Sequence, residues 1–418
     1  MCGIVGYVGS ADTETVLFNM LEGVEYRGYD SCGMATLCGD TICTKKTLGG
    51  VENIKPMIST KNKSFLGIAH TRWATHGGVS IINAHPHIST NKQWAVVHNG
   101  IIENYLELKE ELLDCEDINF TSETDTEVIV QLLQKYEQKD PLKTIKTVCK
   151  KLVGTYALAI INLDRPQQIF VAKNGSPLYV ALGESGGFVA SDPICFSGYS
   201  DKYFSLDDGE FASISDNEIH FFDNNLIPID KSVQLLKMSL DGFGLKEYDH
   251  FMQKEILETE LVLKNIEKEY GNGGAFKIIN KSTLKAIENI MLIGCGTAYH
   301  AGLMGERFIE KFAHISARTY IASEFRYMDV VVPPNSIAIL VSQSGETADT
   351  LGALSELKKR GITTIALTNV SYSTLAKLCD HVFPLFAGTE KAVASTKAYT
   401  AQIAILYFRT LSRWGQKQ

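Results

Sequence analysis

The chain has 418 residues, 45% of them hydrophobic and 21% charged, which is the composition of an ordinary globular protein. At roughly 150 residues per domain, this length predicts two domains and at most three. The formal net charge of −8 argues against nucleic acid as the main partner, because phosphate binding requires a basic surface.

The pattern of apolar residues and cysteines indicates the compartment. No uncharged apolar run approaches the ~18 residues needed to cross a bilayer, and no basic segment precedes an apolar stretch at the N-terminus. The nine cysteines are odd in number and include no C-x-x-C pair, so the sequence suggests neither a disulfide framework nor a zinc site. We therefore expect a cytoplasmic protein with no membrane association.

The first part of the chain, residues 2–237, alternates short β-like runs with a few helical segments. Strands are predicted at 3–8, 64–70, 93–102, 155–163, 168–173, 177–182 and 187–191. Apolar residues at helical spacing predict helices at 13–26, 104–115 and 125–139. Many strands and few helices indicate a layered fold with large sheets.

A change of rhythm near residues 238–248 marks a domain boundary. Two glycines appear there, and the pattern loosens. Beyond this linker, the 249–418 part begins with a helical stretch at 249–270. Predicted strands at 289–294, 317–322, 336–342, 363–368 and 381–386 then alternate with helical segments. This β-α-β alternation predicts a doubly wound parallel sheet flanked by helices.

The second residue is a cysteine, and this position has chemical consequences. If Met1 is removed, Cys2 carries both a thiol and a free α-amino group. An α-amino group has a pKa of roughly 8 and can act as a base for the thiol near neutral pH. Taken alone, this position favours a small buried residue that begins a strand, and the segments described next reverse that interpretation.

Three further segments carry polar residues that strands alone do not require. The segment 67–77 ends in a cluster of His70, Arg72, Trp73, Thr75 and His76. A guanidinium such as that of Arg72 can hold a carboxylate by bidentate hydrogen bonds. The other two segments are 96–104, where Asn99 and the Gly100 N–H can form an oxyanion hole, and 122–127, where Asp125 can pair with an ammonium group. The alternative for each segment is ordinary capping or a turn.

Taken together, these segments resemble the glutamine-hydrolysing domain of the class II amidotransferases, a branch of the N-terminal nucleophile hydrolases. The resemblance covers residues 2–237 and rests on CGIVGY (2–7), YRGYDS (26–31), AHTRWATHG (69–77), NAHPH (83–87), VHNGIIEN (97–104) and SETDTE (122–127). It implies an αββα sandwich fold.

The resemblance to this family also implies a role for each matching residue. Cys2 would be the nucleophile, forming a thioester and releasing ammonia, with Asn99 and Gly100 as the oxyanion hole. The glutamine-binding residues would be Arg72 for the α-carboxylate, Asp125 for the α-amino group, Trp73, Thr75 and His76 along the pocket, and Arg27 in the lid region 26–31. Trp73 would also gate ammonia, whereas we expect His85 and His87 to be structural.

Two Gly-rich turns between strand and helix form a second constellation. GCGTAYHAG (294–302) lacks the glycine spacing of a dinucleotide fingerprint, and LVSQSGETADT (340–350) lacks the lysine of a P-loop. Free N–H groups at a helix start attract anions, and hydroxyls add donors for a phosphate. Each turn alone could be a well-capped helix, but two turns on adjacent units point to a site at the carboxyl ends of the strands.

Residues 289–402 resemble the first lobe of a sugar isomerase domain, a fold that binds phosphosugars. GCGTAYHAG, SEFRY (323–327) with VSQSGETADTL (341–351), and AGTEKAVASTKAYTAQ (387–402) carry the match. The implied sugar-phosphate-binding residues are Thr297, Ser342, Gln343, Ser344, Thr347, Val393 and Ser395. Some family members have a serine at the position of Ala298, so this residue is assigned no contact.

The two domains in this order resemble the amidotransferases that make amino sugars. The resemblance implies transfer of the glutamine amide nitrogen to fructose 6-phosphate, giving glucosamine 6-phosphate and glutamate, without metal or organic cofactor and in a homodimer joined through the isomerase domain. The family has a second isomerase lobe that we do not expect in this chain. A glutaminase that only binds a sugar phosphate therefore stays open, as do a non-enzymatic phosphosugar sensor and a purine-pathway amidotransferase.

Overall fold

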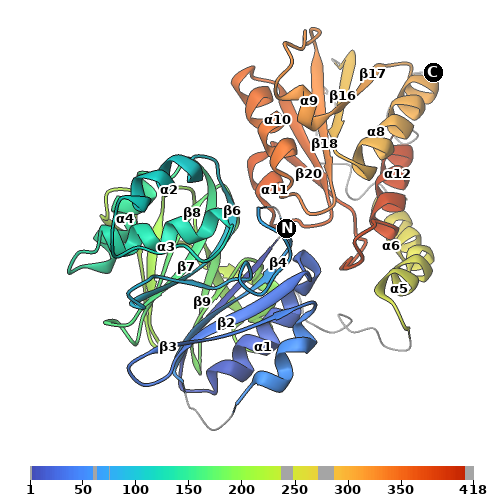
Figure 1. Cartoon of the computed structure of the whole chain (residues 1–418). Helices are drawn as coiled ribbons and strands as arrows, with labels where there is room; N and C mark the ends of the chain where they lie inside the picture. Colours follow the sequence, from blue (N-terminus) through green and yellow to red (C-terminus); the bar gives the residue numbers. More distant parts are fainter. Residues whose placement is uncertain (1, 60–63, 75, 237–247, 272–286, 410–418) are drawn as a thin grey trace. The chain divides into compact units, whose positions relative to one another are not determined.

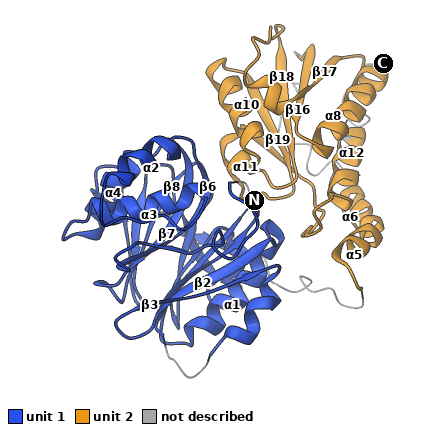
Figure 2. Ribbon diagram, viewed as in Figure 1, with its two compact units in different colours: residues 1–243 blue, residues 244–418 orange. Residues whose placement is uncertain are grey.

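The structure is a computed structural model that describes residues 2–59, 64–74, 76–236, 248–271 and 287–409. The chain forms two compact units, residues 1–243 and 244–418 (Figure 2). The predicted linker at 238–248 lies outside the described residues except for Tyr248. None of the helices in the described residues has the length and apolar character that crossing a membrane requires.

Unit 1 is built on two antiparallel sheets. Along the eight-stranded sheet the order is β15 (Gln234–Leu235), β11 (Lys202–Ser205), β9 (Tyr179–Gly183), β10 (Gly186–Ala190), β1 (Gly3–Gly9), β4 (Leu66–Arg72), β2 (Ser31–Leu37) and β3 (Ile42–Leu48). Along the seven-stranded sheet it is β14 (Pro228–Ile229), β13 (Ile219–Phe222), β12 (Phe211–Ile214), β8 (Ile169–Asn174), β7 (Gly154–Asn162), β6 (Trp94–Ile102) and β5 (His87–Ile88).

The sheets pack face to face, and helices cover both outer faces (Figure 1). Successive side chains of a strand point to opposite faces, so β1 places Ile4 and Val8 in the core between the sheets and Val5 and Tyr7 against α1 (Thr13–Val24). The outer face of the other sheet packs against α2 (Tyr105–Leu113), α3 (Asp125–Lys135) and α4 (Pro141–Cys149). These four layers confirm the predicted αββα sandwich.

Unit 2 contains a five-stranded parallel sheet. Its strand order is β17 (Ser316–Ile321), β16 (Asn289–Gly294), β18 (Ser336–Ser342), β19 (Thr363–Thr368) and β20 (His381–Pro384). One face packs against α6 (Thr259–Gly271), α8 (Thr297–Phe308) and α12 (Lys397–Arg409), and the other against α9 (Ala322–Phe325), α10 (Ala348–Lys359) and α11 (Thr374–Leu378). The predicted doubly wound sheet is confirmed.

The order of these strands reverses between β16 and β18, which are neighbours although β17 lies between them in the sequence. In such sheets ligands bind outside the carboxyl ends of the strands, at the point of reversal. The two Gly-rich turns follow β16 and β18, so the fold brings both to this point.

One predicted element differs from the structure. The helical stretch 249–270 is two helices, α5 (Phe251–Leu257) and α6 (Thr259–Gly271), with Glu258 between them. The two helices have different partners. Buried residues of α6 such as Ile266 enter the core, whereas carboxylates at and beside α5 bind the chain at 391–397.

Candidate active site

Cys2 lies immediately before β1, at the end of the eight-stranded sheet. Its Sγ accepts a hydrogen bond from the Trp73 N–H at 3.3 Å and lies 3.6 Å from the Trp73 carbonyl oxygen. Both hydrogen bonds that the sulfur makes to described residues thus go to the Trp73 main chain. Burial raises the pKa of the Cys2 thiol, and the hydrogen bond from Trp73 opposes this only in part. The thiol therefore needs a base to react near neutral pH.

Asn99, on β6 of the other sheet, reaches Cys2. Its Nδ2 donates to the Cys2 carbonyl oxygen at 3.0 Å, and its Oδ1 lies 3.1 Å from the His70 Nε2. Gly100 follows with a φ of 136°, and a Cβ there would lie 2.0 Å from the Thr155 carbonyl oxygen, so only glycine fits. The geometry thus places a side-chain amide donor beside Cys2, and such a donor can stabilise a negative oxygen.

Arg72 ends β4 and is almost fully buried, next to the Cys2 end of the sheet. Its guanidinium donates to the carbonyl oxygens of His76, Gly77 and Gly78. Asn83 holds the same segment through a hydrogen bond of 3.0 Å to the Gly78 carbonyl. A guanidinium has five N–H groups. Among the described residues, the three bonds to the main chain leave two of these N–H groups without a partner.

The other predicted pocket residues make contacts of different kinds with their surroundings. Asp125 is the first residue of α3 and accepts from the Ile102 N–H at 2.9 Å. Trp73 is 36% exposed and contacts Tyr29 edge to face, with ring centroids 5.4 Å apart. His76 packs edge to face against Tyr105. Thr75 lies outside the described residues.

Arg27, which the resemblance places in the lid region 26–31, is held by neighbouring side chains. It is buried and forms an ion pair with Asp192 at 3.0 Å, and its Nε donates to the Tyr26 hydroxyl. The bonds described here hold the 26–31 segment against the 192–196 segment. Asp30 connects this segment to the site, because its carboxylate accepts from the Ala74 N–H at 2.8 Å.

Four histidines near Asn99 are buried, each at most 5% exposed: His70, His85, His87 and His98. His70 stacks on His85 with ring centroids 4.1 Å apart, and His87 meets His85 edge to face. Burial lowers the pKa of His70 to about 3 and those of the other three below their ordinary value. These rings are therefore neutral near pH 7. Sequence reasoning placed His70 in a polar cluster but gave it no role.

In unit 2, the turn after β18 is closed by its own hydroxyl groups. The Ser342 Oγ accepts from the Gly345 N–H at 3.0 Å and lies 3.3 Å from the Thr347 Oγ1. Ser344 Oγ accepts from the Glu346 N–H. Gly345 has a φ of 68°, and a Cβ there would lie 2.1 Å from the Ser373 Oγ. The turn after β16 begins beside it, since Gly294 pairs with Val341 in the ladder, and Thr297 is exposed at the start of α8.

Val393 and Ser395 come from a third segment, between β20 and α12. The Ser395 hydroxyl donates to Glu390 at 2.8 Å, whereas Val393 is 66% exposed. Glu255 accepts from the N–H groups of Lys391 and Ala392 and so anchors this segment to α5. The segment is held by carboxylates, and Gln343, Ser344 and Thr347 are half-buried on the neighbouring turn.

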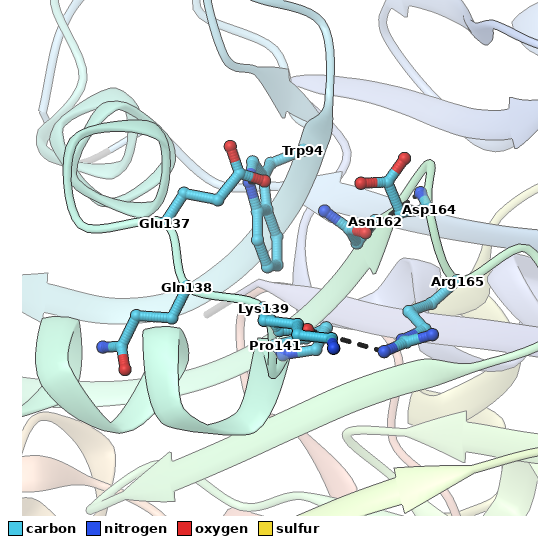
Figure 3. Close-up of a pocket in the computed structure, with 8 residues that line it drawn as sticks. All are labelled: Trp94, Glu137, Gln138, Lys139, Pro141, Asn162, Asp164 and Arg165. Carbon is cyan, nitrogen blue, oxygen red and sulfur yellow. Dashed lines mark hydrogen bonds between the residues drawn. The ribbon is translucent and has the colours of Figure 1, made fainter.

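A surface pocket in unit 1 is separate from these residues. It measures about 420 Å³ and lies where the α3–α4 connection meets the start of β6 and the end of β7 (Figure 3). Charged side chains of both signs, including Glu137, Lys139 and Arg165, surround it, and none of the predicted site residues does. We assign it no role in the chemistry.

A cysteine beside an amide donor at the ends of two packed antiparallel sheets, joined to a parallel phosphosugar-type sheet, defines a two-domain glutamine amidotransferase. Residues 70–197 match the glutamine amidotransferase domain family, and residues 283–411 match the SIS domain family. These matches lie in units 1 and 2 respectively.

Two curated relatives identify the particular family. The chain is 42% identical over 413 residues to the glutamine–fructose-6-phosphate aminotransferase (isomerizing) of Oceanobacillus iheyensis, covering 97% of this chain and 68% of the relative. It is 42% identical over 417 residues to that of Caldanaerobacter subterraneus, covering 98% and 68%. The chain belongs to the glutamine–fructose-6-phosphate aminotransferase (isomerizing) family.

A solved structure is similar to part of the chain. The C-terminal domain of glucosamine-fructose-6-phosphate aminotransferase from Francisella tularensis is 38% identical, with a TM-score of 0.38, over 40% of this chain and 48% of that one.

Proposed function

We propose that this chain hydrolyses glutamine at Cys2 and transfers the amide nitrogen to fructose 6-phosphate, giving glutamate and glucosamine 6-phosphate. One observation carries the first half of this proposal. The Asn99 amide donates to the Cys2 carbonyl at 3.0 Å, which places a donor from one sheet beside a nucleophile from the other. The domain assignment that goes with the proposal gives residues 2–237 to glutamine hydrolysis and 249–418 to the sugar phosphate.

In the proposed mechanism, the α-amino group of a Met1-free chain takes the thiol proton as Cys2 Sγ attacks the glutamine carboxamide carbon. The Asn99 Nδ2 and the Gly100 N–H stabilise the negative oxygen of the tetrahedral intermediate. The C–N bond then breaks, the amino group returns a proton and ammonia leaves. Water hydrolyses the γ-glutamyl thioester, which releases glutamate and restores the thiol.

Binding of glutamine uses groups whose charges oppose those of the ligand. Arg72 has two N–H groups that bind none of the described residues and can hold the α-carboxylate, and Asp125 pairs with the α-ammonium group. Both side chains are almost fully buried, so water competes weakly for these contacts. Trp73, Thr75 and His76 complete the pocket in this proposal, with Trp73 as the gate for ammonia. Arg27 acts through its ion pair with Asp192 and so shapes the 26–31 segment rather than touching the ligand.

The sugar phosphate binds in unit 2 at the point where the strand order reverses. Hydroxyl and amide groups of Ser342, Gln343, Ser344 and Thr347 hold the phosphate together with the start of α10, whose positive dipole end favours an anion. Thr297, Val393 and Ser395 line the remainder of the sugar site.

A narrower function is glutamine hydrolysis with sugar-phosphate binding but without transfer. The assigned residues favour this narrower function. Those in unit 1 make up a hydrolytic site, whereas those assigned in unit 2 bind phosphate and sugar and include no base for isomerisation.

A paired assay separates the two functions. Met1-free protein receives glutamine and fructose 6-phosphate, and glutamate and glucosamine 6-phosphate are measured separately, with Cys2→Ala as the control. Equal amounts of both products support the full reaction. Glutamate alone supports the narrower function. If neither glutamate nor glucosamine 6-phosphate forms, the proposed role of Cys2 is contradicted.

Maturation offers a second test of the same mechanism. If Met1 is retained, the α-amino group lies one residue too far along to serve the thiol. We expect such a preparation to fold with an unchanged melting temperature but to release no glutamate. Full activity in a Met1-retaining preparation, verified by mass spectrometry, would contradict the α-amino base.

We infer further that the chain works in the cytoplasm and forms a homodimer through unit 2. All nine cysteines are free thiols in the structure, which fits a reducing compartment. Light scattering of the full chain gives its oligomeric state, and a monomer at micromolar concentration would contradict the dimer.

A further inference from the structure

The orientation of the Asn99 amide decides whether it can serve as an oxyanion donor. A side-chain amide has a donor end and an acceptor end of nearly the same shape. Only the orientation with Nδ2 towards Cys2 stabilises a negative oxygen, and the reverse one would repel it. Something in the protein must therefore distinguish the two ends.

Two contacts distinguish the ends: the Cys2 carbonyl oxygen accepts from the Asn99 Nδ2 at 3.0 Å, and on the other side the His70 Nε2 faces two acceptors. It lies 3.0 Å from the His98 carbonyl oxygen and 3.1 Å from the Asn99 Oδ1. A carbonyl oxygen can only accept, so this nitrogen must carry the proton. A donor at this point attracts the oxygen end of the Asn99 amide, which turns the NH₂ end towards Cys2.

The second nitrogen of His70 fits this tautomer. Its Nδ1 is buried and has no hydrogen-bond partner among the described residues. The face of the ring stacks on His85, whose Nδ1 accepts from the His98 N–H at 3.4 Å. In the neutral ring, Nδ1 carries only a lone pair without a partner. A second proton would place a charged N–H group at the same buried position, which costs more free energy.

The neighbouring rings hold His70 in place. The His98 Nδ1 contacts the Thr126 hydroxyl at 2.9 Å and its Nε2 lies 3.4 Å from the Thr155 carbonyl oxygen, which fixes the main chain that His70 contacts. His70 itself is fully buried on β4. It is enclosed by protein, so it acts on the reaction indirectly, and its contact with Asn99 is the direct link to the Cys2 site.

We propose that His70 is a positioning residue for glutamine hydrolysis, which holds the Asn99 amide with its donor end towards the oxyanion. This inference rests on the proposed function, because it concerns the same Cys2 site. It assigns a task to a buried histidine that no part of the hydrolytic mechanism uses directly.

Three substitutions of His70 test the proposal, because they differ in where they place an N–H donor. A glutamine places its amide nitrogen near the position of the histidine Nε2, an asparagine places it near Nδ1, and a leucine has none. We expect H70L and H70N to lower kcat for glutamine hydrolysis about 10²-fold, in the range found when one oxyanion donor is lost. H70Q should remain within about fivefold of the parent, and KM should change less than threefold in all three.

Two further measurements separate positioning from a general structural effect. Alkylation of Cys2 by iodoacetamide forms no oxyanion, so its rate should stay within about twofold in each variant. In an N99A background, H70L should lower kcat no further, because its effect passes through Asn99. A kcat for H70L and H70N within threefold of the parent, or a full additional loss in N99A, would overturn the proposal. If H70L does not fold, the comparison of H70Q with H70N decides.

Nuclear magnetic resonance gives a readout that does not need catalysis. In the full chain, the Asn99 side-chain NH₂ signal should keep its position in H70Q and move in H70N. An inactive parent chain with this pattern would overturn the proposed function, and with it the role in hydrolysis, while still showing that His70 orients the Asn99 amide. An active parent in which the signal is the same in all variants would overturn the positioning alone.

Discussion

The two proposed sites of this chain use different kinds of chemical group. In unit 1, the groups that contact glutamine in our proposal are side chains from both sheets, and Arg72, Asn99 and Asp125 are at most 6% exposed. In unit 2, the proposed site consists of turns with hydroxyls and main-chain N–H groups, and Val393 on the third segment is 66% exposed.

This difference follows from what each site must do. An oxyanion exists only during the reaction, so its donors must be aligned beforehand and kept dry. A phosphate is a stable anion, and the start of a helix with hydroxyl groups on the preceding turn suffices to bind it. In our proposal, unit 1 uses buried charges to bind glutamine and a fixed amide to stabilise the oxyanion, whereas unit 2 uses main-chain N–H groups and hydroxyls to bind a phosphate.

Removal of the proposed nucleophile should have the largest effect, and it should affect unit 1 alone. We expect Cys2→Ala to lower glutamate release at least about 10³-fold, because the covalent route disappears. Binding of fructose 6-phosphate, measured by calorimetry, should stay within twofold. Glutamate release at the parental rate would show that the hydrolytic site lies elsewhere.

The buried ion pair in unit 1 gives the next effect in size. Asp192→Asn leaves the Arg27 guanidinium buried beside a neutral amide, and we expect a loss of about 3 kcal/mol in the free energy of unfolding of unit 1. Denaturation followed through the fully buried Trp94 measures it.

Asp216→Asn, at an exposed turn of the same unit, is the matched control and should change stability by less than about 0.5 kcal/mol. Equal effects of the two substitutions would argue that the ion pair is not stabilising.

Acid should destabilise unit 1 more than unit 2. Histidine has a pKa of about 6.5 when unfolded, whereas burial lowers that of His70 to about 3. The unfolded state therefore binds the proton first, and stability is lost as pH falls from about 6.5 towards 3. At pH 5 His70 alone removes about 2 kcal/mol, and His85, His87 and His98 act in the same direction.

Calorimetry at pH 7.5 and 5 should show a large drop in the melting transition of unit 1. Unit 2 carries its histidines at half-buried or exposed positions, among them His300 and His314, so its transition should move less. His220→Gln, at an exposed position of unit 1, should leave the difference unchanged. A larger shift in unit 2 would contradict this account.

The smallest effect concerns the turn after β18. Ser342→Ala removes the acceptor of the Gly345 N–H and one proposed phosphate ligand. We expect affinity for fructose 6-phosphate to fall about tenfold, or about 1.4 kcal/mol, and glutamate release to remain unchanged. Ser355→Ala, on the exposed side of α10, is the control for calorimetry. Parental affinity in S342A would place the phosphate elsewhere.

The sequence by itself determined the local elements and singled out the residues to which we assign the chemistry. Apolar alternation at 3–8 and 336–342 predicted β1 and β18, and Gly-rich turns predicted the starts of α8 and α10, because strand and helix periods are properties of neighbouring residues. Cys2 was recognisable because its chemistry depends on its position in the chain.

Only the tertiary structure decided which of these residues meet. Asn99 reaches Cys2 across two sheets, Arg27 pairs with Asp192, and the Arg72 guanidinium holds its own following segment. The proton on the His70 Nε2 follows only from two acceptors that lie 28 and 29 residues away along the chain. Hydrogen bonds of this kind depend on sheet register and packing over long separations, which no local pattern of residue types contains.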